Sequence, residues 1–165
     1  MADQFNKDLE KIFDQHDELE RTRTQQVQET QRQEDEFLSR FAEVRKTVIR
    51  PAFERIGALL EARGHSFKIE ESEYAKHGDG KLISSATITM YVAPGESKGN
   101  SRPHDLPHIG YHVHYVHTKK VTLFVSTIAS GSGTSGGKGD FPLEAITSDL
   151  IDQHTLAFLK EILVR

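Results

Sequence analysis

Five of the nine histidines in the chain lie within 14 consecutive residues. They are His104, His108, His112, His114 and His117, in the segment "HDLPHIGYHVHYVH". An imidazole can ligate a metal, transfer a proton near neutral pH, or serve as a hydrogen-bonding side chain. The cluster therefore has three interpretations: a metal site, a proton relay, and the polar face of a β-strand.

If the segment is a strand, the histidines divide between its two faces, because successive side chains of a strand point in opposite directions. One face carries His108, His112, His114 and Val116, and the other carries Ile109, Tyr111, Val113, Tyr115 and His117. An antiparallel sheet can bury one face and leave the other in contact with water. We expect the tyrosine- and valine-bearing face to pack beneath helices and the histidine-bearing face to be partly solvated.

The following strand, residues 121–129, decides which residues meet across the pair. A three-residue loop at 118–120 places Val121, Leu123 and Val125 on the tyrosine and valine face, and burial fixes register. His112 then lies opposite Ser126, and His114 lies opposite Phe124. Imidazoles, a hydroxyl and an apolar ring are typical of a small-molecule site. The candidate ligand-binding residues are therefore His112, His114, Ser126 and Phe124.

A metal on this face would need a third ligand, since protein-bound first-row ions usually have three or more. His108 lies four residues from His112, about 13 Å along an extended strand. Lys119 and Lys120 follow the cluster where a carboxylate would be useful. We predict no cofactor and assign neither a metal ligand nor a catalytic residue. A metal site stays open as an alternative.

The glycine-rich segment "SGSGTSGGKGD", residues 130–140, stands between a strand and a later helix, as a phosphate-binding loop does. The spacing does not fit, because the Walker pattern needs a glycine five residues before Gly137 and a hydroxyl after Lys138. Ser132 and Gly139 occupy those positions. We expect a flexible linker at 130–140, and a long polar loop at 93–107, which is either functional or only flexible.

A long helix precedes these strands. Apolar residues recur at helical spacing near the N-terminus, fade through the glutamine-rich residues 20–36, and return from Phe37 onward. A single helix of about 60 residues would span roughly 90 Å. Pro51 predicts a kink or a restart with the proline at the first helical position, and Gly64 predicts the end of the helix.

Four strands and a final helix complete the chain. Runs rich in β-branched and aromatic residues predict strands at 66–74, 81–92, 109–117 and 121–129, and Asp79-Gly80 predicts a tight turn between the first two. Thr147 should cap the last helix. Its expected apolar face comprises Leu150, Ile151, Leu156, Leu159 and Ile162. The expected fold is α+β: a long N-terminal helix, a four-stranded antiparallel sheet, and a C-terminal helix packed on one sheet face.

The N-terminal helix has an apolar stripe without an obvious cover. We divide the chain into a projecting helix, 1–36, and an α+β domain, 37–165. The candidate partner-binding residues are Phe5, Leu9, Ile12, Phe13 and Leu19. Neither glycine nor proline marks a turn between Asp3 and Arg50, so a second chain is the expected cover. We predict a homo-oligomer, most simply a dimer, or binding to another protein. The polar middle fits a loose coiled coil or a single solvated helix.

Composition narrows the function further. Lys and Arg number 11 against 14 Asp and Glu over residues 1–64, and 10 against 11 over residues 65–165. Nucleic-acid binding usually leaves a basic footprint, so we expect no nucleic acid partner. The sequence has no run of roughly 20 apolar residues for a membrane span and no cysteine. A cytoplasmic, non-enzymatic assembly or adaptor protein is the expected function. The alternative is a small-ligand-binding or metal-dependent enzyme that uses the histidine-bearing face.

Overall fold

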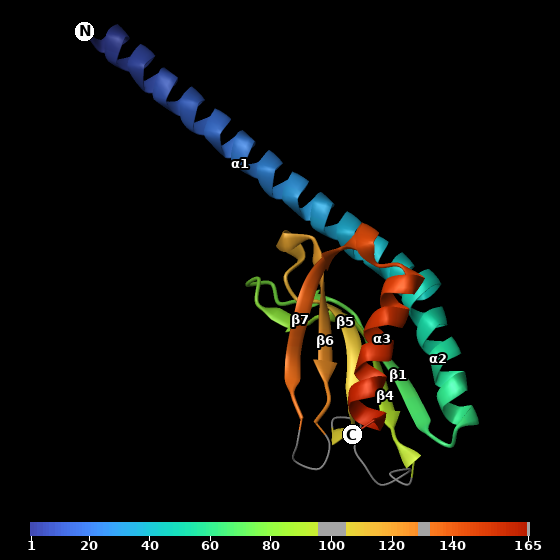
Figure 1. The fold of residues 1–165 in the computed structure, drawn as a ribbon. Coiled ribbons are helices and arrows are strands. Elements are labelled where there is room, and N and C mark those ends of the chain that lie inside the picture. The colour runs from blue at the N-terminus through green and yellow to red at the C-terminus, as the bar shows by residue number, and fades with distance from the viewer. Residues whose placement is uncertain (96–104, 129–132, 165) are drawn as a thin grey trace. The chain divides into compact units, whose positions relative to one another are not determined.

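The computed structural model describes residues 1–95, 105–128 and 133–164. It has the predicted α+β class, with an antiparallel sheet and helices at both ends of the chain (Figure 1). The chain divides into two units, Met1–Glu36 and Phe37–Arg165, which are described separately below.

The first unit consists of the N-terminal part of helix α1 (Ala2–Val44). Long polar side chains favour the helix here, because they lose little rotamer freedom in it. They also form pairs one turn apart. Gln4 donates to Asp8 at 3.0 Å, and the Arg32 guanidinium contacts Glu29 at 2.7 Å and Glu36 at 3.3 Å. Such exposed pairs each contribute only a few tenths of a kcal/mol.

The second unit begins with Phe37 and Phe41 of α1, which are buried. A π-helical turn, Arg45–Ile49, then leads into α2 (Arg50–Ala62). The Arg50 amide donates to the Arg45 carbonyl five residues back. Pro51 lacks an amide proton and lies in the first turn of α2. The discontinuity predicted at Pro51 therefore takes the form of a widened helical turn.

Five strands form the main sheet, in the order β1-β4-β5-β6-β7, and every neighbouring pair is antiparallel. Their bounds are β1 Ser66–Ser72, β4 Ala86–Ala93, β5 His108–Val113, β6 Lys120–Ser126 and β7 Ser135–Pro142. Because each strand pairs with the next along the chain in this series, the sheet is a simple meander. The predicted sheet had one strand fewer.

A separate two-stranded hairpin interrupts the predicted strand 81–92. It comprises β2 (Ala75–Lys76) and β3 (Leu82–Ser84). The Asp79-Gly80 turn is confirmed: Gly80 has a positive φ of 86°, and the Lys81 amide donates to Asp79 Oδ1 at 3.0 Å. Residues 81–92 therefore contribute to two strands of different sheets.

Strand β7 corrects the prediction of a linker at 130–140. Residues 135–140 pair with β6, and residues 130–132 lie outside the described part of the chain. Thr122 Oγ1 donates to Asp140 Oδ1 across the pair at 2.7 Å. The ladder uses backbone groups, which glycine supplies as well as any residue. The glycine-rich residues have a low strand propensity, so the sequence did not predict this strand, which pairing with β6 stabilises.

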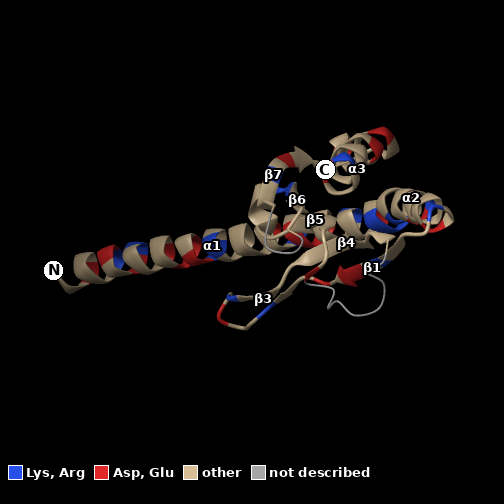
Figure 2. Cartoon of the chain, turned by 60° about the horizontal axis from the view of Figure 1, so that its bottom comes forward, with Lys and Arg blue, Asp and Glu red and all other residues tan. Residues whose placement is uncertain are grey.

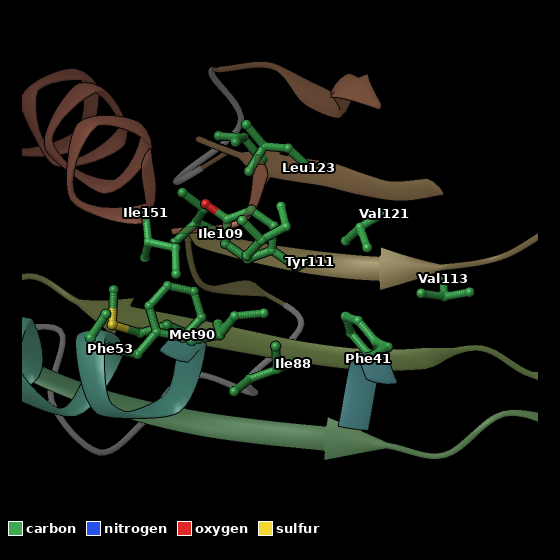
Figure 3. Close-up of a cluster of buried hydrophobic side chains, with 14 of the residues drawn as sticks. Phe41, Phe53, Ile88, Met90, Ile109, Tyr111, Val113, Val121, Leu123 and Ile151 are labelled. Carbon is green, nitrogen blue, oxygen red and sulfur yellow. The ribbon is translucent and has the colours of Figure 1, made fainter. Parts of the chain in front are cut away.

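Helices α2 and α3 (Ser148–Leu163) cover one face of the sheet (Figures 1 and 2). Between helices and sheet lies a core that includes Phe41, Phe53, Tyr111 and Ile151 (Figure 3). The predicted burial of Tyr111, Val113, Leu123 and Val125 is confirmed. These side chains come from alternate positions of β5 and β6, which places the opposite face away from the helices.

Thr147 caps α3, with the Leu150 amide donating to its Oγ1 at 3.2 Å. The predicted apolar face of α3 is only partly correct. Leu156 is 71% exposed, whereas Thr155 and Phe158 are buried together with Ile151. The spacing of apolar residues allowed two adjacent faces, and packing against the sheet selected the one centred on Ile151 and Phe158.

Candidate functional site

The sheet face opposite the helices is built as three rows of three residues. Thr87, His112 and Thr122 form one row across β4, β5 and β6. Thr89, Gly110 and Phe124 form the next, and Tyr91, His108 and Ser126 form the third. We call these nine residues the histidine face. Hydroxyls, imidazoles and one phenyl ring dominate these nine residues of the three central strands. On the same side of the sheet, Lys68 and Glu70 of β1 and Asp140 of β7 flank them.

The register differs from the predicted one. His112 lies opposite Thr122 instead of Ser126, and Gly110 takes the place opposite Phe124 that was expected for His114. Strand β5 ends at Val113, and the connection to β6 contains a 3-10 turn, Val116–Thr118. The longer connection shifts the pairing by four residues. Because four is even, every residue of the paired strands keeps its predicted face.

The same connection overturns two finer predictions. Val116 is buried and Tyr115 is 66% exposed, the reverse of simple alternation. Alternation holds only while the chain is extended, and here the chain has left the sheet. Lys119 has a positive φ of 52° and ends the turn. His117 lies exposed on this turn, and His104 lies outside the described residues.

Three rings stack in the middle of the histidine face. Phe124 lies between His108 and His112, with centroid distances of 5.7 and 5.3 Å and interplanar angles of 12° and 10°. Gly110 leaves space for this arrangement. A Cβ there would lie 2.7 Å from Thr89 Oγ1 and 2.9 Å from His112 Nε2. An aromatic ring thus covers a strand glycine directly across the pair, which is a known means of stabilising such positions.

Hydroxyls and a carbonyl hold the imidazoles in place. His112 Nε2 lies 3.2 Å from Thr89 Oγ1, and His114 Nδ1 lies 2.7 Å from Ser85 Oγ. His108 Nδ1 donates to the Leu106 carbonyl at 2.9 Å. His112 and His114 meet edge to face at 5.2 Å. The imidazoles of His108, His112 and His114 therefore have defined orientations in the free protein.

Burial lowers the pKa of His112 to about 4, and the neighbouring imidazoles of His114 and His108 add to the shift when charged. Desolvation disfavours the imidazolium, so His112 is neutral at neutral pH. A neutral imidazole exchanges hydrogen bonds and stacks on other rings but attracts no anion. The histidine face therefore suits an uncharged polar or aromatic ligand better than a phosphate.

Metal binding finds little support in the geometry. Among the described residues, no group of three or more His, Asp or Glu side chains is arranged to hold an ion. The ring nitrogens of His112 and His114 that face their neighbours are already engaged by hydroxyls. Each of these two imidazoles is hydrogen-bonded to a hydroxyl of the protein.

The structure brings some of the predicted ligand-binding residues together and separates others. His112 and Phe124 share the ring stack, and His114 contacts His112 from beyond the end of β5. Ser126 is buried opposite His108, two rows away from His112. The role of Gly110 was not predicted. A glycine inside a strand two residues from a histidine was the available signal for it.

The predicted partner-binding residues lie together along one side of α1 in the first unit. Phe5, Ile12, Phe13 and Leu19 are each more than half exposed, and Leu9 is partly exposed. We call these five residues the N-terminal stripe. His16 lies within the same arc of the helix and is the polar member of this surface. Leaving such a surface in contact with water is unfavourable, because each large side chain forgoes roughly 1.5 to 3 kcal/mol of burial free energy.

Within the described residues, no helix combines the length and the hydropathy that crossing a bilayer requires. Comparisons with protein-family models, with curated proteins and with solved structures find no match. The function must therefore be argued from the sheet face and the helix stripe themselves.

Proposed function

We propose that this protein is a non-enzymatic assembly or adaptor protein that forms a homo-oligomer, most simply a dimer, through its N-terminal helix. One observation carries the proposal: four large apolar side chains of the N-terminal stripe are more than half exposed. The stripe lies in a helix that has Lys, Arg, Asp and Glu residues along its length (Figure 2).

The energetics favour a protein cover for the stripe. An isolated helix is marginal in water, and most helical stability in proteins comes from packing an amphipathic face. Burying five large apolar side chains at roughly 1.5 to 3 kcal/mol each exceeds the cost of ordering them on an existing helix. A second copy of the chain is a cover that accompanies the protein itself, and its occupancy of the stripe rises with protein concentration.

The test is the mass in solution of variants that disrupt the stripe. Ile12→Asp with Leu19→Asp should convert an oligomeric full-length protein to a monomer, as measured by light scattering after gel filtration. The matched control is Gln25→Asp with Gln28→Asp, which adds the same charge on the side of the same helix that faces away from the stripe. A monomeric native protein, or an oligomer unaffected by the stripe variant, contradicts the proposal.

A second candidate function is favoured by the histidine face. Thr89, Tyr91 and Ser126 are buried although they point away from the helices, and His112 and His114 are held by hydroxyls. This resembles a preorganised surface for a small uncharged ligand, in an enzyme or a binding protein. Ring-proton NMR signals of His112 and His114 should then shift saturably with one member of a panel of uncharged polar and aromatic compounds. The Phe124→Ala variant should lose that response.

A further inference from the structure

The second unit has an apolar groove between α2 and α3, with a volume of about 320 Å³. Figure 1 shows the two helices side by side over the sheet. The walls of the groove include Ile56, Leu59 and Leu60 from α2 and Thr155, Leu156 and Leu159 from α3. An ion pair between Arg55 and Asp152 joins the two helices beside it.

The exposed leucines of this groove are those of an uncovered surface. Leu59 and Leu156 stand on its opposite walls and are 64% and 71% exposed. Thr155, between the two helices, is fully buried, and its Oγ1 has no hydrogen-bond partner among the described residues. In helix-in-groove complexes, an amphipathic helix lays its apolar face into an apolar groove of this kind.

The N-terminal stripe has the width that such a groove requires. At 100° per residue its five side chains cover an arc of roughly 120°, because Phe13 lies beside the seam of Phe5, Leu9, Ile12 and Leu19. An arc of that width is typical of a helix that packs on a globular surface, whereas a two-stranded coiled coil uses a narrower seam. The seam also becomes polar after Leu19, so a coiled coil would have only about two apolar heptads.

Charge favours the groove over a second N-terminal helix. Residues 1–36 contain 5 Lys and Arg against 11 Asp and Glu, a net charge of −6. Residues 37–165 contain 16 against 14, a net charge of +2. Helices α2 and α3, which form the groove, contain 3 Lys and Arg against 5 Asp and Glu, a net charge of −2. Two N-terminal helices side by side would therefore repel each other more strongly than an N-terminal helix and the helices of the groove.

We propose that the N-terminal stripe of one copy docks in the α2–α3 groove of a second copy, and that two copies exchange these helices reciprocally. The inference depends on the proposed function, since it names the surface that the stripe recognises. Eight exposed side chains from two stripes at roughly 100 Å² each, together with the walls of two grooves, reach the roughly 1,200 Å² of a stable interface. The reciprocal arrangement closes as a two-fold dimer.

Engineered cysteines test the pairing directly, because the native chain has none. Full-length Ile12→Cys and Leu156→Cys proteins are mixed and oxidised, and each is oxidised alone as a control. We expect a covalent dimer in the mixture that contains both variants, as identified by mass spectrometry, and little in either control. Rapid cross-linking of the Ile12→Cys protein alone, with no mixed product, overturns the inference and shows that the N-terminal helices pair with each other.

Light scattering separates failure of this inference from failure of the proposed function. Leu59→Asp with Leu156→Asp should raise the dimer dissociation constant roughly 100-fold, the effect of removing central contacts. The matched control, Ala58→Asp with Ala157→Asp, adds the same charge on exposed positions outside the groove. A groove variant that stays dimeric, while the stripe variant is monomeric, overturns the groove and leaves the proposed function intact. A monomeric native protein overturns both.

Discussion

At the scale of single residues, Gly110 permits the ring stack of the histidine face. A Cβ at this position would lie 2.8 Å from the Ile88 carbonyl oxygen and 2.7 Å from Thr89 Oγ1. Because the carbonyl belongs to the backbone of a central strand, it cannot move aside. We expect Gly110→Ala to lower the free energy of unfolding by about 1 to 3 kcal/mol, the usual cost of overpacking.

Urea denaturation measures this change, and Gly137→Ala is the matched control in the same sheet. A Cβ at Gly137 meets Thr122 Cγ2 at 3.4 Å, an ordinary contact. An equal loss of stability in both variants would show that glycine is required for backbone reasons alone and that the stack is incidental.

The lowered pKa of His112 predicts how stability depends on pH. The folded pKa is about 4, against about 6.5 in the unfolded chain. The unfolded state therefore binds more protons between these values. The contribution to stability is complete above pH 6.5 and is lost as the pH falls toward 4. The total loss from this group is on the order of 3 kcal/mol.

Urea denaturation at pH 7 and pH 4.5 checks this dependence, with His112→Asn as the comparison. The variant should lose less stability over this interval than the native protein. His154, whose pKa burial also lowers, leaves a residual slope in the same direction. An identical slope in native and variant proteins would contradict the shift assigned to His112.

The faces of the histidines could be predicted from sequence, but their partners could not. Alternation with Tyr111 and Val113 fixed which side of the sheet His112 occupies. The register depended on the turn at 114–119, whose left-handed Lys119 is not a residue that the sequence marks as a turn former. The stack of His108, Phe124 and His112 depends on that register, so it could not be predicted from the sequence.

At the scale of elements, Arg45 ties the π-helical turn to the sheet. It is 7% exposed, and its Nη1 donates to the Ser72 carbonyl at 3.0 Å. Its guanidinium also pairs with Glu73 and lies 3.8 Å from Glu71. We expect Arg45→Met to destabilise the protein by roughly 2 to 3 kcal/mol, because the partly buried Ser72 carbonyl loses a charged donor.

Thermal denaturation tests this role, and Arg40→Met provides the control. Arg40 pairs with Glu144 at 2.6 Å, but both side chains are at least half exposed. Its removal should leave the melting temperature unchanged within error, since exposed ion pairs contribute little. An equal fall in melting temperature in both variants would show that Arg45 stabilises the protein through its charge alone.

Helices and the central strands were predictable at this scale, and the irregular elements were not. Periodicity and β-branched residues identify α3, β4, β5 and β6. Strand β7 is built from "SGGKGDFP", in which local propensity opposes the structure and only pairing with β6 supports it. The π turn likewise depends on how the helix accommodates Pro51 while burying Arg45 and Ile49.

At the scale of the whole molecule, the core and the N-terminal stripe belong to different units. Every member of the buried apolar cluster lies between Phe37 and Phe158, so removal of residues 1–34 takes away no core contact. We expect the shortened chain to fold with an unchanged core and to be monomeric. Three features support a folded domain with a separate assembly element. They are the division at residue 36, the acidic N-terminal helix and the uncovered stripe.

Concentration distinguishes this arrangement from a single cooperative unit. Association stabilises the folded state by mass action, so the Tm of the full-length protein should rise between about 1 and 100 µM. The shortened chain should melt at one temperature throughout that range, close to the low-concentration limit of the full-length protein. Calorimetry at both concentrations is the measurement. A shortened chain that fails to fold, or a full-length Tm independent of concentration, would mean that residues 1–36 stabilise their own domain and do not join two copies.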